Sequence, residues 1–199
     1  MQINPESVFI LLIGVIIFNF FKDIFLDYLN SKNFDNKIPE IISDVYNHEK
    51  YLKSQEYKKS QYQFSKYSKI YSLIIILCFF YFDGFIILDN FCRDLFESPI
   101  LISLSFFGII FFGNELLSLP FSIFFTFVIE EKFGFNKTTI QIYIFDKLKS
   151  WILTILFGGG ILGFIILQEQ LIGANFWIVA WIFITGLSII LNGFYAQII

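Results

Sequence analysis

The sequence is poor in the residues from which metal and catalytic sites are usually built. It has one histidine, His48, and two cysteines, Cys78 and Cys92, among 199 residues. It contains no H-E-x-x-H, G-x-S-x-G or phosphate-loop motif. A zinc site needs several converging donors, and the two cysteines have no metal-ligand spacing and lie within or just after an apolar run. We therefore expect no catalytic residue and no cofactor in this chain, a hydrated surface histidine, and free thiols at apolar positions.

Charged residues are also scarce. They make up 16% of the chain, whereas 56% of the residues are hydrophobic and 29 are phenylalanine. A soluble domain of this length has too much surface to cover with so few polar groups. The net charge of −3 gives no indication of a nucleic-acid partner. The composition predicts an integral membrane protein whose first partner is the lipid bilayer.

Five apolar runs are long enough to be considered as membrane spans, since a helix needs about 20 residues to cross the hydrocarbon core. Open strands are excluded at that depth because their backbone groups would lack partners. The first run has no basic residue before it and no small-residue cleavage site after it, so we expect it to be retained. The fold class predicted is all-α, a polytopic membrane helix bundle with about five transmembrane helices. The runs are Val8–Leu26, Ile70–Leu88, Pro99–Ile129, Trp151–Leu167 and Phe176–Ile198.

The distribution of basic residues predicts the orientation. The first connection, about residues 30–69, and the third, which follows Pro99–Ile129, hold twelve lysines between them. The second connection holds only Arg93, and the fourth, Gln168–Asn175, holds none. Cytoplasmic connections carry the excess of lysine and arginine. We therefore expect the first and third connections to face the cytoplasm and the N-terminus to lie outside. The twelve are Lys32, Lys37, Lys50, Lys53, Lys58, Lys59, Lys66, Lys69, Lys132, Lys137, Lys147 and Lys149.

The first connection is the longest polar stretch, and its segment Glu40–Ser65 contains no glycine or proline. Its composition predicts a helix, with Glu49 and Lys53, and Asp44 and His48, at i,i+4 spacing. One interpretation is a solvated helical extension of the second span. The other is a helix that lies on the membrane surface or binds a partner.

The third run has unusual polar residues for its length. At 31 residues it would be about 46 Å long as an α-helix, and it contains Asn114, Glu115 and Pro120. Pro120 should produce a kink because the Leu116 carbonyl loses its partner. An acid inside a span is costly and seldom faces lipid. Either Asn114 and Glu115 face a hydrated cavity, or they make an interhelical hydrogen bond that holds the bundle together.

Glycines interrupt the fourth run. Gly159 and Gly163 are four residues apart and share a helix face, so they would let a neighbouring backbone approach closely. We expect this face to serve in helix packing.

A more specific pattern follows Pro120. Leu119–Ser122 and Thr126–Thr139 closely resemble the signature of the N-terminal membrane region of type I CAAX prenyl proteases. Glu49–Tyr51, Lys53–Ser54 and Tyr57 resemble the first cytoplasmic loop of this family, and Asp146–Lys149 and Phe194–Ala196 also fit. The resemblance covers nearly the whole chain, so residues 1–199 are expected to form one such domain, with the signature loop at about 119–139.

The resemblance implies a zinc metalloendopeptidase of the endoplasmic reticulum membrane or the bacterial inner membrane, with seven membrane helices around a water-filled chamber. It implies prenylated or membrane-protein substrates. The use of Phe, Ile, Asn and Lys favours a bacterial source and thus the inner membrane.

The sequence departs from the family in one respect. Family members continue beyond the position of Ile199 into a portion with H-E-x-x-H and a further glutamate. We expect this chain to be catalytically incomplete, with zinc present only when that metalloprotease portion is supplied. The alternative is a stand-alone, non-enzymatic membrane scaffold or binding protein with the same fold. A channel or transporter is a weaker hypothesis, because no inverted repeat is visible.

The signature loop also has a local mechanism. Glu130 and Glu131 end the third run, Gly134 allows a tight turn, and Asn136 can bond to local backbone. Thr138 or Thr139 is expected to cap the helix that follows.

Overall fold

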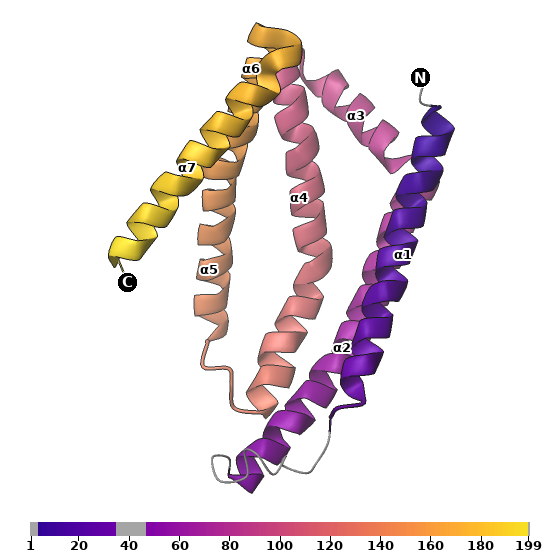
Figure 1. The fold of residues 1–199 in the computed structure, drawn as a ribbon, viewed down its shortest axis with the longest axis vertical. Helices are drawn as coiled ribbons and strands as arrows, with labels where there is room; N and C mark the ends of the chain where they lie inside the picture. Colours follow the sequence, from indigo (N-terminus) through magenta and orange to yellow (C-terminus); the bar gives the residue numbers. More distant parts are fainter. Residues whose placement is uncertain (1–3, 35–46, 199) are drawn as a thin grey trace. The chain divides into compact units, whose positions relative to one another are not determined.

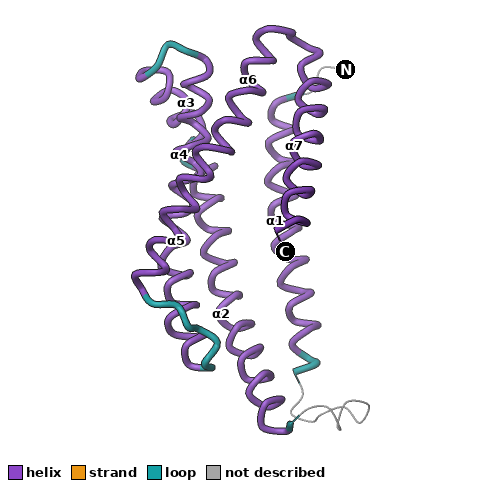
Figure 2. Tube along the Cα trace, turned by 90° about the vertical axis from the view of Figure 1, so that its left-hand side faces the viewer, coloured by secondary structure: helices purple, strands orange, loops and turns teal. Residues whose placement is uncertain are grey.

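The computed structural model describes residues 4–34 and 47–198, and every regular element in these ranges is a helix (Figures 1 and 2). The predicted all-α fold class is confirmed. η2 and η3 are π-helical and η4 is a 3₁₀ turn. The elements are α1 Pro5–Ser31, α2 His48–Tyr81, α3 Gly84–Leu95, α4 Pro99–Phe124, η2 Phe125–Glu130, α5 Ile140–Leu153, η3 Thr154–Gly159, α6 Gly160–Ile172, η4 Gly173–Asn175 and α7 Phe176–Ile198.

Four helical stretches of the described chain are long and apolar enough to cross a membrane: Glu6–Ser31, His48–Tyr81, Pro99–Glu130 and Ile140–Gly193. The last one reverses direction at Gly173, which has a φ of 65° that a residue with a side chain rarely adopts. α6 and α7 pack against each other beyond this turn, and the rings of Phe164 and Phe183 lie 4.2 Å apart. The fourth stretch therefore consists of two helical segments that run in opposite directions. Counted this way, the apolar helical segments number five, as expected. The side on which the N-terminus lies stays a prediction.

The described chain divides into two compact units, of which the first comprises Met1–Phe85 and Leu116–Lys137. α1 and α2 pack as an antiparallel pair within it. Phe9 meets Phe80 at one end, with ring centroids 5.7 Å apart, and Lys69 forms an ion pair with Asp27 at the other. The ring of Phe64 on α2 packs on three rings of α4 and η2: Phe121, Phe124 and Phe125. These contacts hold the end of the third predicted run against α2.

α2 continues the polar connection directly into the membrane span. Asn47 caps it, because its side-chain oxygen accepts from the backbone N–H of Glu49 at 2.9 Å. The interpretation of an extended second span is therefore confirmed from His48 onward. The rest of the expected polar helix, Glu40–Tyr46 with Asp44, lies outside the described residues.

The predicted end of the second span was wrong. Instead of continuing to Leu88, α2 stops at Tyr81, and Asp83 adopts a φ of 52°. A new helix, α3, begins at Gly84, where a Cβ would come within 2.7 Å of the Phe79 ring. Hydropathy did not reveal this break, because the residues on both sides of it are apolar.

The second unit comprises Ile86–Glu115 and Thr138–Ile199. α5, η3 and α6 follow one another without a loop from Ile140 to Ile172, so the helix is longer than the predicted Trp151–Leu167. A Cβ on Gly163 would meet the side chain of Leu104 on α4 at 3.9 Å, whereas one on Gly159 would meet nothing within 4 Å. Among the described residues, no backbone of a neighbouring helix lies within 4 Å of either Cβ position.

Candidate functional site

Glu115 is bonded to two side chains of a neighbouring helix in the second unit. Its Oε2 accepts from Lys147 Nζ at 2.9 Å and from Trp151 Nε1 at 3.2 Å. Lys147 and Trp151 are one turn apart on α5, so one helix face supplies both donors. Phe112, one turn before Glu115, packs edge-on against the Trp151 indole with ring centroids 5.7 Å apart. This contact helps to hold the indole N–H towards the carboxylate.

The arrangement contains the interhelical bond that the sequence offered as one interpretation of Glu115. An ion pair that also has a neutral donor reduces the cost of placing charges among apolar helices. The side chains of Glu115 and Lys147 remain 24% and 29% exposed, so the pair is open to its surroundings on one side. A hydrated cavity on that side stays a prediction.

Sequence reasoning missed both partners of Glu115. Lys147 was counted with the cytoplasmic lysines, and Trp151 was taken only as the start of an apolar run. Their i,i+4 spacing, preceding an apolar helix, was the signal that could have found them.

The other two polar positions of the third run behave differently. Asn114 is exposed and lies beside Glu115 in the chain, but the donors of α5 bond to Glu115. α4 remains α-helical through Pro120, and π-helical bonding replaces the α-helical pattern from Phe125 to Glu130. Such π segments in longer helices often occur at functional sites. A kink at Pro120 stays a prediction.

The signature loop of the first unit forms the expected turn. Gly134 has a φ of 73° and donates its N–H to the Glu131 carbonyl at 2.9 Å. The Glu130 carbonyl accepts from the N–H groups of Phe135 and Asn136, at 2.9 and 3.3 Å. The tight turn at Gly134 is therefore confirmed.

Tyr57 of α2 holds this loop in place. Its hydroxyl donates to the side chain of Glu130, and its ring packs on Phe133 and Phe135 with centroid distances of 5.4 and 4.7 Å. Phe133 is only 4% exposed, so the loop is anchored by an apolar residue as well as by an acid. Glu131 points to the exposed side. The sequence showed Tyr57 only as part of the family resemblance and did not pair it with Glu130.

The end of the signature leads into α5 in the second unit. Thr139 is the capping residue, since its Oγ1 accepts from the N–H of Ile142 at 3.3 Å. The expected threonine cap is confirmed and assigned to Thr139.

The part of the chain that the structure describes does not fit a zinc ion. Within the described ranges no three or more His, Cys, Asp or Glu side chains gather in a way that could hold a metal. The one histidine of the sequence, His48, is exposed at the start of α2. Of the two free thiols, Cys92 is buried and Cys78 is exposed.

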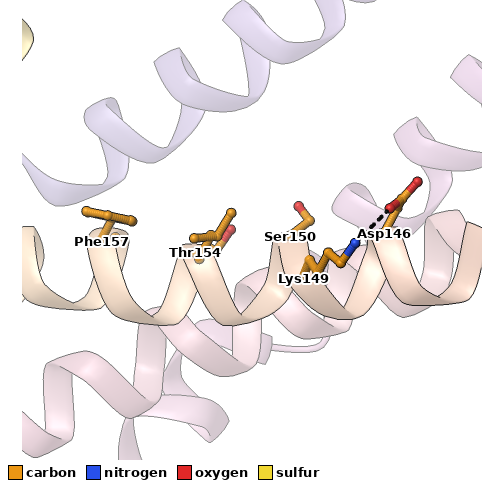
Figure 3. Close-up of a pocket in the computed structure, with 7 residues that line it drawn as sticks. Asp146, Lys149, Ser150, Thr154 and Phe157 are labelled. Carbon is orange, nitrogen blue, oxygen red and sulfur yellow. Dashed lines mark ion pairs between the residues drawn. The ribbon is translucent and has the colours of Figure 1, made fainter. Parts of the chain in front are cut away.

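An open groove of about 540 Å³ runs along one face of α5 and η3 (Figure 3). Asp146 and Lys149 form an ion pair of 3.7 Å at one end of it. Ser150, Thr154, Phe157 and Gly158 continue the same face. Of the described residues that line the groove, only the two of that exposed ion pair are titratable.

These observations define an integral membrane protein whose helices carry a docked polar loop and an interhelical ion pair. The family model described as CAAX prenyl protease N-terminal, five membrane helices, matches residues 27–199, and the chain belongs to this family.

Relatives and a solved structure agree with this assignment. The chain is 29% identical to the CAAX prenyl protease 1 homolog of Dictyostelium discoideum over 189 residues, 92% of this chain and 44% of the relative. It is 33% identical to CAAX prenyl protease 1 of Saccharomyces cerevisiae over 138 residues, 64% of this chain and 30% of the relative. The crystal structure of S. mikatae Ste24p superposes with a TM-score of 0.84 at 29% identity, covering 96% of this chain and 46% of that one. The chain thus spans less than half the length of these proteins.

Proposed function

We propose that this chain is the chamber-forming N-terminal membrane part of a CAAX prenyl protease-like zinc metalloendopeptidase, and that these 199 residues do not hydrolyse peptides by themselves. The observation that carries the proposal is the match of the family's N-terminal domain to a chain that spans less than half of its relatives. Zinc hydrolysis of the H-E-x-x-H type needs two imidazoles one turn apart, a further ligand and a general base. A chain with one histidine does not provide them.

The two polar features support a role in forming the walls of a chamber. The Glu115 and Lys147 pair puts charge on facing surfaces of α4 and α5 while leaving one side open. The loop at Glu130 is held against α2 by Tyr57, so it offers a defined surface beside α2's polar extension. In this proposal a catalytic metalloprotease portion packs beside that loop and supplies the zinc, and the substrates are prenylated or membrane proteins.

The membrane in which the protein resides depends on whether its source is bacterial or eukaryotic. Residue usage favours a bacterial inner membrane, whereas the relatives described above are eukaryotic. We propose the endoplasmic reticulum membrane for a eukaryotic source.

Split-chain reconstitution tests the function. This chain would be co-expressed with the remaining C-terminal portion of the S. mikatae relative, and the purified membranes would be assayed for zinc content and for cleavage of a prenylated peptide. We expect co-purification, zinc binding and cleavage only when both chains are present. Variant Tyr57→Ala should weaken co-purification, and variant Phe107→Ala, at an exposed position of α4, serves as the matched control.

Two outcomes would contradict the proposal. One tightly held zinc per chain, or cleavage, without the second portion would show an independent enzyme. A well-expressed chain that never associates with the catalytic portion would favour the non-enzymatic scaffold.

A further inference from the structure

The short helix α3 is separated from the membrane span that precedes it. The break at Phe82–Asp83 ends α2. The next helix begins at once at Gly84, which lies close against the ring of Phe79. α3 has 12 residues, about 18 Å of helix, which is too short to cross a hydrocarbon core of about 30 Å. It also carries Asp89, Arg93 and Asp94. It is therefore not a sixth span.

Three kinds of side chain lie on different faces of α3. Cys92 is fully buried, with Leu88 one turn before it on the inner face. Ile87, Phe91 and Leu95 follow one another at intervals of four and are 63%, 51% and 56% exposed. Asn90 and Arg93 are exposed on the remaining face, and Asp94 is exposed at its border with the stripe. Ile86, the one other exposed apolar side chain of this helix, lies between Arg93 and Asn90.

The polar face has its own charge pairing. Arg93 Nε donates to Asp89 Oδ2 at 2.7 Å within the helix, so the charges on α3 do not require a distant partner. The exposed stripe of Ile87, Phe91 and Leu95 has no partner of this kind. Keeping three large apolar side chains in water would cost free energy. A helix with a polar face and an apolar face suits the boundary between headgroups and acyl chains.

We propose that α3 is an in-plane interfacial helix, and that Ile87, Phe91 and Leu95 insert into the acyl-chain boundary of the leaflet in which α2 ends and α4 begins. The connectivity favours lipid as the occupant, because α3 joins the ends of two spans and therefore starts and finishes at one membrane face. Both spans have exposed apolar side chains at those ends, Tyr81 on α2 and Leu101 on α4, as expected of helix ends that meet lipid. This inference does not depend on a protease function.

Site-directed spin labelling of the full chain in nanodiscs with one copy each tests the proposal. Single cysteines would be introduced after Cys78→Ser and Cys92→Ala, as Ile87→Cys, Phe91→Cys and Leu95→Cys on the stripe and Asn90→Cys and Arg93→Cys on the polar face. Collision rates with oxygen, which partitions into lipid, and with a water-soluble nickel chelate would be compared at each position. Ile10→Cys, on the exposed surface of α1, provides the lipid control, and Lys58→Cys provides the aqueous control.

We expect the ratio of oxygen to chelate collisions to be several-fold higher at the three stripe positions than at Asn90 and Arg93, with values near that of Ile10. High chelate collision rates at all positions would overturn the proposal, because α3 would then lie in water. Protection of the stripe from both reagents would also overturn it, because protein and not lipid would then cover this face. The same result is expected for each of the three stripe variants, so the test remains if one of them fails to fold.

Discussion

Glu115 on α4 and Lys147 on α5 form an ion pair at 2.9 Å, although 32 residues separate them in the sequence. The pair joins two helices that otherwise present mainly apolar side chains, and Trp151 adds a second donor to the same oxygen. Polar bonds between membrane helices contribute modestly, about 0.6 kcal/mol on average and up to roughly 1.7 kcal/mol. The pair therefore determines which faces of α4 and α5 meet more than it determines the total stability.

A double-mutant cycle measures this coupling. Variants Glu115→Gln, Lys147→Met and the combination of both would be unfolded in detergent and followed by circular dichroism. We expect each single variant to lose stability and the cycle to give a coupling free energy of about 0.5 to 2 kcal/mol. The exchanged pair Glu115→Lys with Lys147→Glu should recover part of the loss. Strictly additive effects would show that the two residues do not interact.

Cysteine labelling tests whether Glu115 also borders a hydrated space. In a chain without native cysteines, Glu115→Cys should react with a small water-soluble thiol reagent in intact membranes, because the open side of the pair would be wet. Phe107→Cys, exposed on the same helix, should be much less reactive because lipid surrounds it. An inert cysteine at 115, beside reactive controls in the polar connections, would leave only the interhelical bond as the role of Glu115.

The docking of the signature loop depends on Tyr57. Tyr57→Phe removes the hydrogen bond to Glu130 and keeps the ring, so we expect a loss of about 0.5 to 1.5 kcal/mol. Tyr57→Ala also removes the packing on Phe133 and Phe135 and should cost more. Limited trypsin cleavage at Lys132 and Lys137 is the measurement, with the rate increasing from wild type through Tyr57→Phe to Tyr57→Ala. Equal cleavage rates in all three proteins would show that Tyr57 does not hold the loop in place.

The turn at Gly134 should be intolerant of a side chain. Gly134→Ala forces alanine to a φ of 73°, which costs about 1 to 2 kcal/mol. Gly159→Ala is the control, because it lies in a helical region with nothing within 4 Å of its Cβ position and alanine favours helix. Thermal unfolding in detergent should show a lower midpoint for the first variant and an unchanged or higher midpoint for the second. The reverse order would contradict the turn's role.

The membrane orientation predicted from the lysines is tested by the side from which introduced cysteines can be labelled. Lys58→Cys and Gln170→Cys, each in a chain without native cysteines, should be labelled from opposite sides of the membrane, with Lys58 on the cytoplasmic side. Labelling of both positions from the outside would refute the topology.

Local features of the signature were visible in the sequence because they depend on a few neighbouring residues. Gly134 was expected to turn the chain and a threonine to cap α5, and both were found. The end of the second span was misplaced, since hydropathy alone does not distinguish one long apolar helix from two that meet at a bend. Asp83 adopts a positive φ there, and the signal that could have located the bend is the Asp83–Gly84 pair, a common turn dipeptide.

The sequence by itself determined that this chain is a helical membrane protein of the CAAX prenyl protease N-terminal family, because hydropathy, residue spacing and the signature after Pro120 are properties of the chain read in order. Only the tertiary structure decided that Glu115 meets Lys147 and Trp151, that Tyr57 holds Glu130, and that Ile87, Phe91 and Leu95 share one open face. These relationships depend on where each helix begins and on how it is rotated against its neighbour. One residue added to or removed from a helix turns every later side chain by about 100°, so the packing, and not the order of residues alone, selects the partners.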